Sequence, residues 1–313
     1  MFVEYMSRAP SIIKEHQLTG HKAAVFALGA GSSPRHFLSG AGDGWIVDWD
    51  LDDPETGKLI AQVESRIFSL CYLREKDLVL AGNMNGGLHW IDLEDPSRTR
   101  NIAHHEKGVF ALLRLGEYVY SAGGQGMLTR WSIGERRSLE SVKLSHTSLR
   151  ALDYSPGRHE FAVGSSDNSI YLLDADSLEV RSAIPEAHEN SVFSLKYQPD
   201  ADRLWSGGRD AHLRVWELEG TPRLLKSLPA HWYTVNALAL SPGGEWLATA
   251  SRDKTIKIWD LASLELRKVL KAGRDGGHIN SVNCLFWTDY GHSLISGSDD
   301  RSLIIWKAGD FRA

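Results

Sequence analysis

Residues 231–261 read HWYTVNALALSPGGEWLATASRDKTIKIWDL, and much of the chain repeats variants of this segment. Apolar and polar residues alternate in three short runs, at 235–240, 246–250 and 256–259, which SPGG and SRDK separate. A fourth run follows at 266–270. Short alternating runs rich in β-branched and aromatic residues, bounded by Gly, Pro, Ser and Asp, are typical of strands joined by tight turns. The segment therefore predicts a unit of four short strands.

The position of Trp259 recurs along the chain at intervals of 40 to 47 residues. It is occupied in turn by Trp49, Ile91, Trp131, Leu173, Trp216, Trp259 and Trp306. Seven units result, with a spacing close to the roughly 40–45 residues of a four-stranded propeller blade.

Three polar positions recur with it. A histidine lies 26 to 28 residues earlier, at His21, His105, His146, His188, His231 and His278. A turn residue, in most units an acid, lies six residues earlier, at Asp43, Asn85, Gln125, Asp167, Asp210, Asp253 and Asp300. A hydroxyl lies four residues before that, at Ser39, Ser121, Ser206, Thr249 and Ser296.

Two dipeptides carry a family resemblance. Gly-His occurs at Gly20–His21 and at Gly277–His278, and Trp-Asp occurs at Trp49–Asp50 and at Trp259–Asp260. Over roughly residues 11–306 the chain resembles the WD-repeat β-propellers. The resemblance implies an all-β fold of seven four-stranded antiparallel blades around a channel.

The two ends of the repeat predict how the ring closes. Only KAGDFRA follows Trp306, which is too short for a fourth strand, whereas residues 11–18 (SIIKEHQL) precede the first histidine without a partner. We expect residues 11–18 to form the outer strand of the last blade, since an open ring would expose strand edges. Residues 1–10 are then a tail, and residues 11–313 form one propeller domain.

Composition narrows the classes of function. The 313-residue chain has 29 Gly, 11 Trp, two Cys and a formal net charge of -5. An acidic chain without an apolar run of membrane-spanning length argues against membrane insertion and against general affinity for nucleic acid. The start, MFVEYMSRAP, lacks the pattern of a secretory signal, so a cytoplasmic location is expected. Cys71 and Cys284 are expected to be small buried thiols.

The recurring Ser, His and Asp invite comparison with a hydrolase triad. Complete sets occur in units 1, 5, 6 and 7: His21/Ser39/Asp43/Trp49, His188/Ser206/Asp210/Trp216, His231/Thr249/Asp253/Trp259 and His278/Ser296/Asp300/Trp306. Because four identical catalytic sites in one chain would be odd, we interpret them as structural hydrogen-bond chains within blades. We expect no catalytic residue, no metal and no cofactor.

Units 2 to 4 depart from this pattern. Unit 2 has Ser65, Ala81, Asn85 and Ile91 at the four positions, unit 3 has Gln125, and unit 4 has Val163 and Leu173. We expect these blades to be held mainly by apolar packing and to be the softer arc of the ring.

Function should lie where the units differ. The second position of each inner strand reads Phe26, Phe68, Phe110, Arg150, Phe193, Asn236 and Asn283, and the resemblance implies that it lines the channel mouth. Arg209 and Arg252 precede turn acids, and Trp232 and Tyr233 follow a histidine. Aromatic side chains and arginine are enriched at binding hot spots. This set predicts a non-enzymatic scaffold that binds peptides or partner domains carrying acidic and apolar groups.

Two other functions remain open. A propeller hydrolase or lactonase would need carboxylates or histidines converging on the channel, and the seven mouth positions contain neither. An RNA-associated scaffold could use an arc of Arg150, Arg209, Arg252 and Arg274, which the overall acidity disfavours. His104 and His105 do not form a metal site, because adjacent strand residues point to opposite faces.

Overall fold

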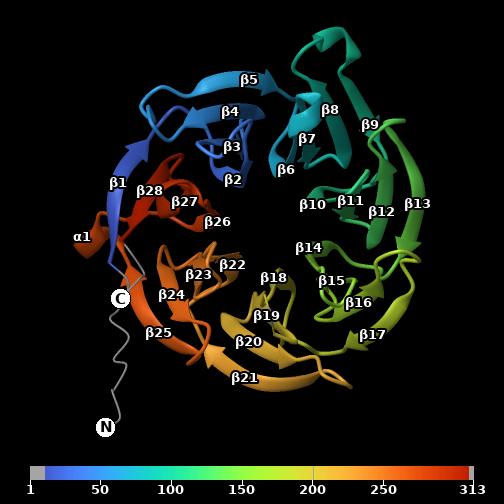
Figure 1. Ribbon diagram of the computed structural model, residues 1–313, viewed down its shortest axis with the longest axis vertical. Coiled ribbons are helices and arrows are strands. Elements are labelled where there is room, and N and C mark those ends of the chain that lie inside the picture. Colours follow the sequence, from blue (N-terminus) through green and yellow to red (C-terminus); the bar gives the residue numbers. More distant parts are fainter. Residues whose placement is uncertain (1–10, 200, 310–313) are drawn as a thin grey trace.

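Seven four-stranded antiparallel sheets surround a central channel in the computed structural model of the chain (Figure 1). The structure describes residues 11–199 and 201–309. The predicted tail 1–10 lies outside the described residues. Within each sheet the first strand lies at the channel and the fourth at the rim, as the all-β propeller prediction requires.

The first six blades follow one another along the chain, each with four consecutive strands. Blades 1 to 3 contain β2 (Val25–Ala30), β3 (His36–Ala41), β4 (Trp45–Asp50), β5 (Lys58–Gln62); β6 (Ile67–Leu73), β7 (Leu78–Asn83), β8 (Gly87–Asp92), β9 (Arg100–Ala103); and β10 (Val109–Leu115), β11 (Tyr118–Gly123), β12 (Met127–Ser132), β13 (Arg137–Lys143). Blades 4 to 6 contain β14 (Leu149–Ser155), β15 (Glu160–Ser165), β16 (Ile170–Asp174), β17 (Val180–Ile184); β18 (Val192–Tyr197), β19 (Arg203–Gly208), β20 (His212–Glu217), β21 (Arg223–Pro229); and β22 (Val235–Leu240), β23 (Trp246–Ser251), β24 (Ile256–Asp260), β25 (Glu265–Leu270).

Blade 7 is built from both ends of the chain. β26 (Val282–Trp287), β27 (Ser293–Ser298) and β28 (Leu303–Ala308) are followed in the sheet by β1 (Ile12–Leu18), which pairs antiparallel with β28. The predicted closure by the N-terminal strand is confirmed. Short helices occur only in connections among the described residues: α1 (Ala272–Asp275), η1 (Arg74–Lys76), η2 (Pro96–Arg98) and η3 (Tyr290–His292).

The core lies between blades. In β24, Ile256 and Ile258 pack against blade 7, whereas Trp259 packs against blade 5. Alternate side chains of a strand point to opposite faces, and here both faces are covered by a neighbouring sheet. Seven apolar clusters, one at each junction, therefore connect the ring.

Candidate functional site

The four complete polar sets are assembled inside their blades. In blade 6 the Trp259 indole N–H donates to the Thr249 hydroxyl over 3.0 Å, and His231 Nε2 lies 2.7 Å from the same oxygen. His231 Nδ1 lies 2.9 Å from an Asp253 carboxylate oxygen. Blades 1, 5 and 7 repeat this geometry at His21/Ser39/Asp43/Trp49, His188/Ser206/Asp210/Trp216 and His278/Ser296/Asp300/Trp306.

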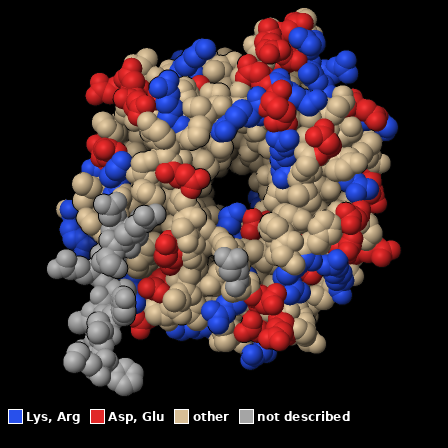
Figure 2. Space-filling view, in the orientation of Figure 1, with Lys and Arg blue, Asp and Glu red and all other residues tan. Residues whose placement is uncertain are grey.

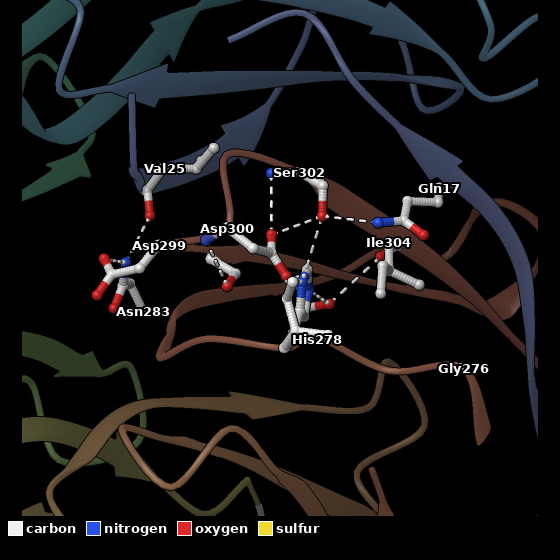
Figure 3. A network of polar contacts seen from close by, with 12 residues as sticks. Gln17, Val25, Gly276, His278, Asn283, Asp299, Asp300, Ser302 and Ile304 are labelled. Atoms are coloured by element: carbon white, nitrogen blue, oxygen red, sulfur yellow. Dashed lines mark hydrogen bonds and ion pairs between the residues drawn. The ribbon is translucent and has the colours of Figure 1, made fainter. Parts of the chain in front are cut away.

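Blade 7 shows how the set is tied to ring closure (Figure 3). The Ser302 hydroxyl donates to Asp300 over 2.6 Å and accepts a hydrogen bond from the Gln17 amide of β1 over 3.2 Å. His278 points toward the same carboxylate. The strand that closes the ring is therefore connected to the buried polar chain as well as to the sheet.

These sets are unsuited to hydrolysis. The hydroxyls of Ser39, Ser206, Thr249 and Ser296 are fully buried, and each already contacts an indole N–H and an imidazole. A nucleophile must reach its substrate, and these oxygens have no open side. Burial lowers the pKa of His21, His188 and His231, so the imidazoles are neutral. Although burial opposes it, hydrogen bonds from histidines and backbone N–H groups lower the pKa of Asp210 and Asp253.

Blade 3 has a complete chain as well, with a glutamine in place of the acid. Trp131 donates to the Ser121 hydroxyl over 2.8 Å, and His105 bridges that hydroxyl (2.7 Å) and the Gln125 side-chain oxygen (3.1 Å). Burial, together with the nearby His104, lowers the pKa of His105 to about 4. The amide oxygen accepts a hydrogen bond but supplies no full negative charge to favour the imidazolium.

Replacing Gln125 with glutamate is expected to raise the pKa of His105, because an isosteric carboxylate favours the charged ring. In the wild type the unfolded imidazole binds a proton near pH 6.5 and the folded one only near pH 4, so unfolding takes up protons between these values. Acidification through this window should remove about 3 kcal/mol of stability. NMR titration of the His105 ring in wild type and Gln125→Glu checks this, and equal pKa values would contradict it.

Blades 2 to 4 contain polar networks of their own beside their apolar packing. Blade 3 keeps the full chain, and in blade 4 the Asp167 carboxylate accepts from Ser145 (2.5 Å) and Tyr171 (2.7 Å). In blade 2 the Asn83 amide donates to Glu64 over 2.7 Å and contacts His89 Nε2 over 3.0 Å. Each irregular blade has its own polar network, and the softer arc stays a prediction.

The prediction of the histidine position is wrong in blades 2 and 4. The residue four positions before the inner strand is His21, His105, His188, His231 or His278 in five blades, but it is Val63 in blade 2 and Ser145 in blade 4. His146, one residue later, is exposed, and Ser65 lies two residues after the true position. In blade 3 the histidine and the serine are 16 residues apart, against 18 in blade 1, because the β10–β11 turn is two residues shorter than the β2–β3 connection. The distance from the histidine to the tryptophan position is therefore not the same in every blade.

All seven predicted mouth residues meet at one end of the channel. They line a cavity of about 270 Å³: Phe26, Phe68, Phe110, Arg150, Phe193, Asn236 and Asn283. Phe68 lies 5.5 Å from Phe26 and 5.2 Å from Phe110 between ring centroids. Each side chain is partly exposed, so the rings contact one another and still face the cavity.

Arg150 is the charged member of this mouth. Its guanidinium carbon lies 3.9 Å from the Phe110 ring centroid and 5.4 Å from that of Phe193. Burial, and secondarily the charge of Arg209, lower its pKa, although an arginine remains charged. No carboxylate of residues 11–199 or 201–309 forms an ion pair with Arg150.

The two asparagines of the mouth, Asn236 and Asn283, also donate hydrogen bonds to the next blade. Asn236 donates to the Val282 carbonyl over 2.8 Å, and Asn283 donates to the Val25 carbonyl over 3.0 Å. Both amides thereby bridge to the inner strand of the next blade, so their nitrogens are occupied within the fold.

Further aromatic and basic side chains are exposed on blades 5 and 6. Trp232 is 86% exposed and Tyr233 60%, and the Arg252 guanidinium lies 5.9 Å from the Tyr233 ring centroid. Arg209, on blade 5, is exposed. Arg274 is not part of this group, because it lies in α1 beside β1 and pairs with Asp275.

Residues 11–199 and 201–309 contain neither a candidate metal cluster nor a membrane-spanning helix. No cluster of three or more His, Cys, Asp or Glu there could hold a metal ion. None of the helices in those ranges is long and apolar enough to cross a membrane. Cys71 and Cys284 are free, and burial raises the pKa of the Cys71 thiol to about 11.

Comparisons with known proteins agree with this architecture. The family model "WD domain, G-beta repeat" matches residues 180–217, 222–260 and 268–307. The "Crystal structure of WD40 beta propeller domain of Doa1" superposes with a TM-score of 0.82 at 21% identity, covering 95% of this chain and 97% of that one.

Curated relatives match over part of the chain. "Ribosome biogenesis protein ytm1" of Aspergillus oryzae is 30% identical over 105 residues, which are 33% of this chain and 21% of that protein. "Small ribosomal subunit protein RACK1" of Schizosaccharomyces pombe is 27% identical over 111 residues, 33% of this chain and 35% of that protein. The matches span about a fifth to a third of these relatives. Together with the fold, they show a seven-bladed β-propeller with WD40 repeats between residues 180 and 307.

Proposed function

We propose that the protein is a non-enzymatic interaction scaffold that binds peptide segments or partner domains at the channel mouth. The observation that carries this proposal is Arg150, a half-buried guanidinium held between two phenylalanine rings with no carboxylate partner in the described part of the chain. A partly desolvated cation interacts strongly with an incoming anion. An acidic side chain of a partner would supply the missing charge.

The surroundings of Arg150 support an adjacent apolar group in the partner. Phe26, Phe68 and Phe110 line the same cavity, whose volume of about 270 Å³ accommodates a side chain. Burying one such ring is worth about 1.5–3 kcal/mol. Trp232, Tyr233 and Arg252 would extend the contact across blade 6.

The alternatives have less support. Seven mouth side chains without a carboxylate or an imidazole offer neither an acid–base pair nor a metal site for a hydrolase or lactonase. For an RNA-associated scaffold, Figure 2 shows acidic and basic side chains intermingled around the opening on the face in view, rather than a basic band. A cytoplasmic location stays a prediction from the sequence.

A selection from displayed random peptides tests the proposal. We expect enrichment of peptides that place Asp or Glu beside an aliphatic or aromatic residue. The double variant Phe110→Asp/Arg252→Glu should lose most of this binding, because it puts a carboxylate beside Arg150 and reverses a charge on blade 6.

A matched control carries the same kinds of change away from the mouth. Leu266→Asp/Arg223→Glu alters exposed residues of the outer strands β25 and β21 and should bind as the wild type does. If the mouth variant also binds unchanged, this face is not the site.

A further inference from the structure

A second cavity lies between blades 1 and 2, away from the channel. It has a volume of about 280 Å³ and lies between β5 on one side and the end of β8 with the loop that follows on the other. Ile91 and Val63 are buried at this junction, whereas Gln62 and Thr99 are exposed beside them. The cavity therefore has an apolar floor and a polar rim.

The other blades show what this space holds elsewhere. At the equivalent place in blade 1 the Trp49 indole is fully enclosed against Gly20 and Gly57, where added Cβ atoms would lie 3.5 Å and 2.7 Å from ring atoms. The residues at the same sequence separations in blade 2 are Ile91, Gln62 and Thr99. All three line the cavity. The cavity is thus the space of a missing indole.

No other side chain of blade 2 replaces that indole. The neighbouring Trp90 points to the opposite face of its sheet, where it packs 6.3 Å from Trp131 between ring centroids. Blade 4 also lacks the tryptophan, but there the Tyr171 ring packs beside Leu173 on the same face. The residue at the Tyr171 position in blade 2 is His89, which is engaged with Asn83 and lines the cavity.

The electrostatics of the cavity favour a neutral occupant. Burial lowers the pKa of His89, so its ring is uncharged at neutral pH. The Asp92 carboxylate is already compensated by Arg136, at 2.8 Å, and more distantly by Arg98. The Glu64 carboxylate, 3.3 Å from His89, is half exposed to solvent and accepts a hydrogen bond from Asn83. A flat apolar ring would replace the contacts that the indoles make in other blades.

We propose that the cavity between blades 1 and 2 binds a neutral aromatic ring of the size of indole. The ring can come from a free heteroaromatic compound or from a tryptophan side chain of a protein segment. This site is independent of the channel mouth and does not depend on the function proposed for it.

Fluorine NMR of 5-fluoroindole with the full chain tests the site. We expect a saturable change in the fluorine signal with wild type. Ile91→Trp fills the cavity from its floor and should weaken binding about tenfold or more. Thr99→Trp covers the rim from an exposed position and should weaken binding to the same extent. It takes the place of Ile91→Trp if that variant fails to fold. Leu266→Trp, which adds an indole to an exposed site on blade 6, is the control and should bind as the wild type does.

Competition identifies the source of the ring. Displacement of 5-fluoroindole by the capped peptide Gly-Ser-Trp-Ser-Gly, but not by its alanine analogue, supports a protein segment, whereas binding of the free compound alone supports a small molecule. No saturable change with wild type, or the same affinity in folded Ile91→Trp or Thr99→Trp, overturns the proposal.

Discussion

Removal of residues 1–18 is expected to lower the melting temperature by about 10 °C or more, because it deletes the outer strand of blade 7. The deletion takes away buried Ile12 and Leu18 and leaves the edge of β28 unpaired. It also removes the Gln17 amide from Ser302 and the Ile12 carbonyl that accepts from Lys268 over 2.6 Å. Thermal unfolding followed by circular dichroism measures the change.

Two controls separate the loss of ring closure from the effect of a shorter chain. Deletion of residues 1–10 keeps every residue of β1 and should leave the melting temperature close to that of the wild type. A synthetic peptide of residues 11–18, added to the longer deletion, should restore part of the loss by pairing in trans. An unchanged melting curve for the 1–18 deletion would show that β1 does not hold the ring closed.

Much of the fold could be predicted because its signals are local. The strands expected in residues 231–270 agree with β22 to β25 to within one residue at each end. Alternation and turn residues determine such strands within one unit. The closure followed from the unequal ends of the repeat.

Which residue takes the place of the histidine was harder to predict in the irregular blades. Spacing from the tryptophan position crosses the connection between the first two strands, which is two residues shorter in blade 3 than in blade 1, whereas the distance of four residues to the inner strand is constant. Counting from Ile67 and Leu149 would have identified Val63 and Ser145.

Contacts between blades could not be predicted from the sequence. Asn236 and Asn283 looked like free polar groups at the mouth, yet Asn236 donates to a carbonyl 46 residues away in the next blade. Ile91 was visible as a departure from the pattern, but whether neighbours fill the lost volume depends on packing between two sheets. In blade 4 the Tyr171 ring packs against the apolar cluster that contains Leu173, whereas in blade 2 a cavity lies beside Ile91.

Replacing Asp253 with alanine is expected to destabilise the protein by about 2–4 kcal/mol, because one buried carboxylate serves several donors. It accepts from His231 (2.9 Å), the Trp232 N–H (3.0 Å), the Thr255 N–H (3.0 Å) and the Thr255 hydroxyl (2.6 Å). Alanine leaves these groups without their acceptor inside blade 6. Asp299→Ala is the control, since Asp299 is exposed and accepts a hydrogen bond only from Asn283 among the described residues.

The pH dependence of the same variant separates loss of the carboxylate from a general packing defect. Hydrogen bonds from His231 lower the pKa of Asp253 against the effect of burial, so its contribution is complete above about pH 4 and is lost as the pH falls toward the folded value. The difference in unfolding free energy between wild type and Asp253→Ala should therefore shrink on acidification below about pH 4. A difference that is constant with pH would assign the defect to packing, and no difference at pH 7 would mean that the polar chain contributes nothing to the stability of the blade.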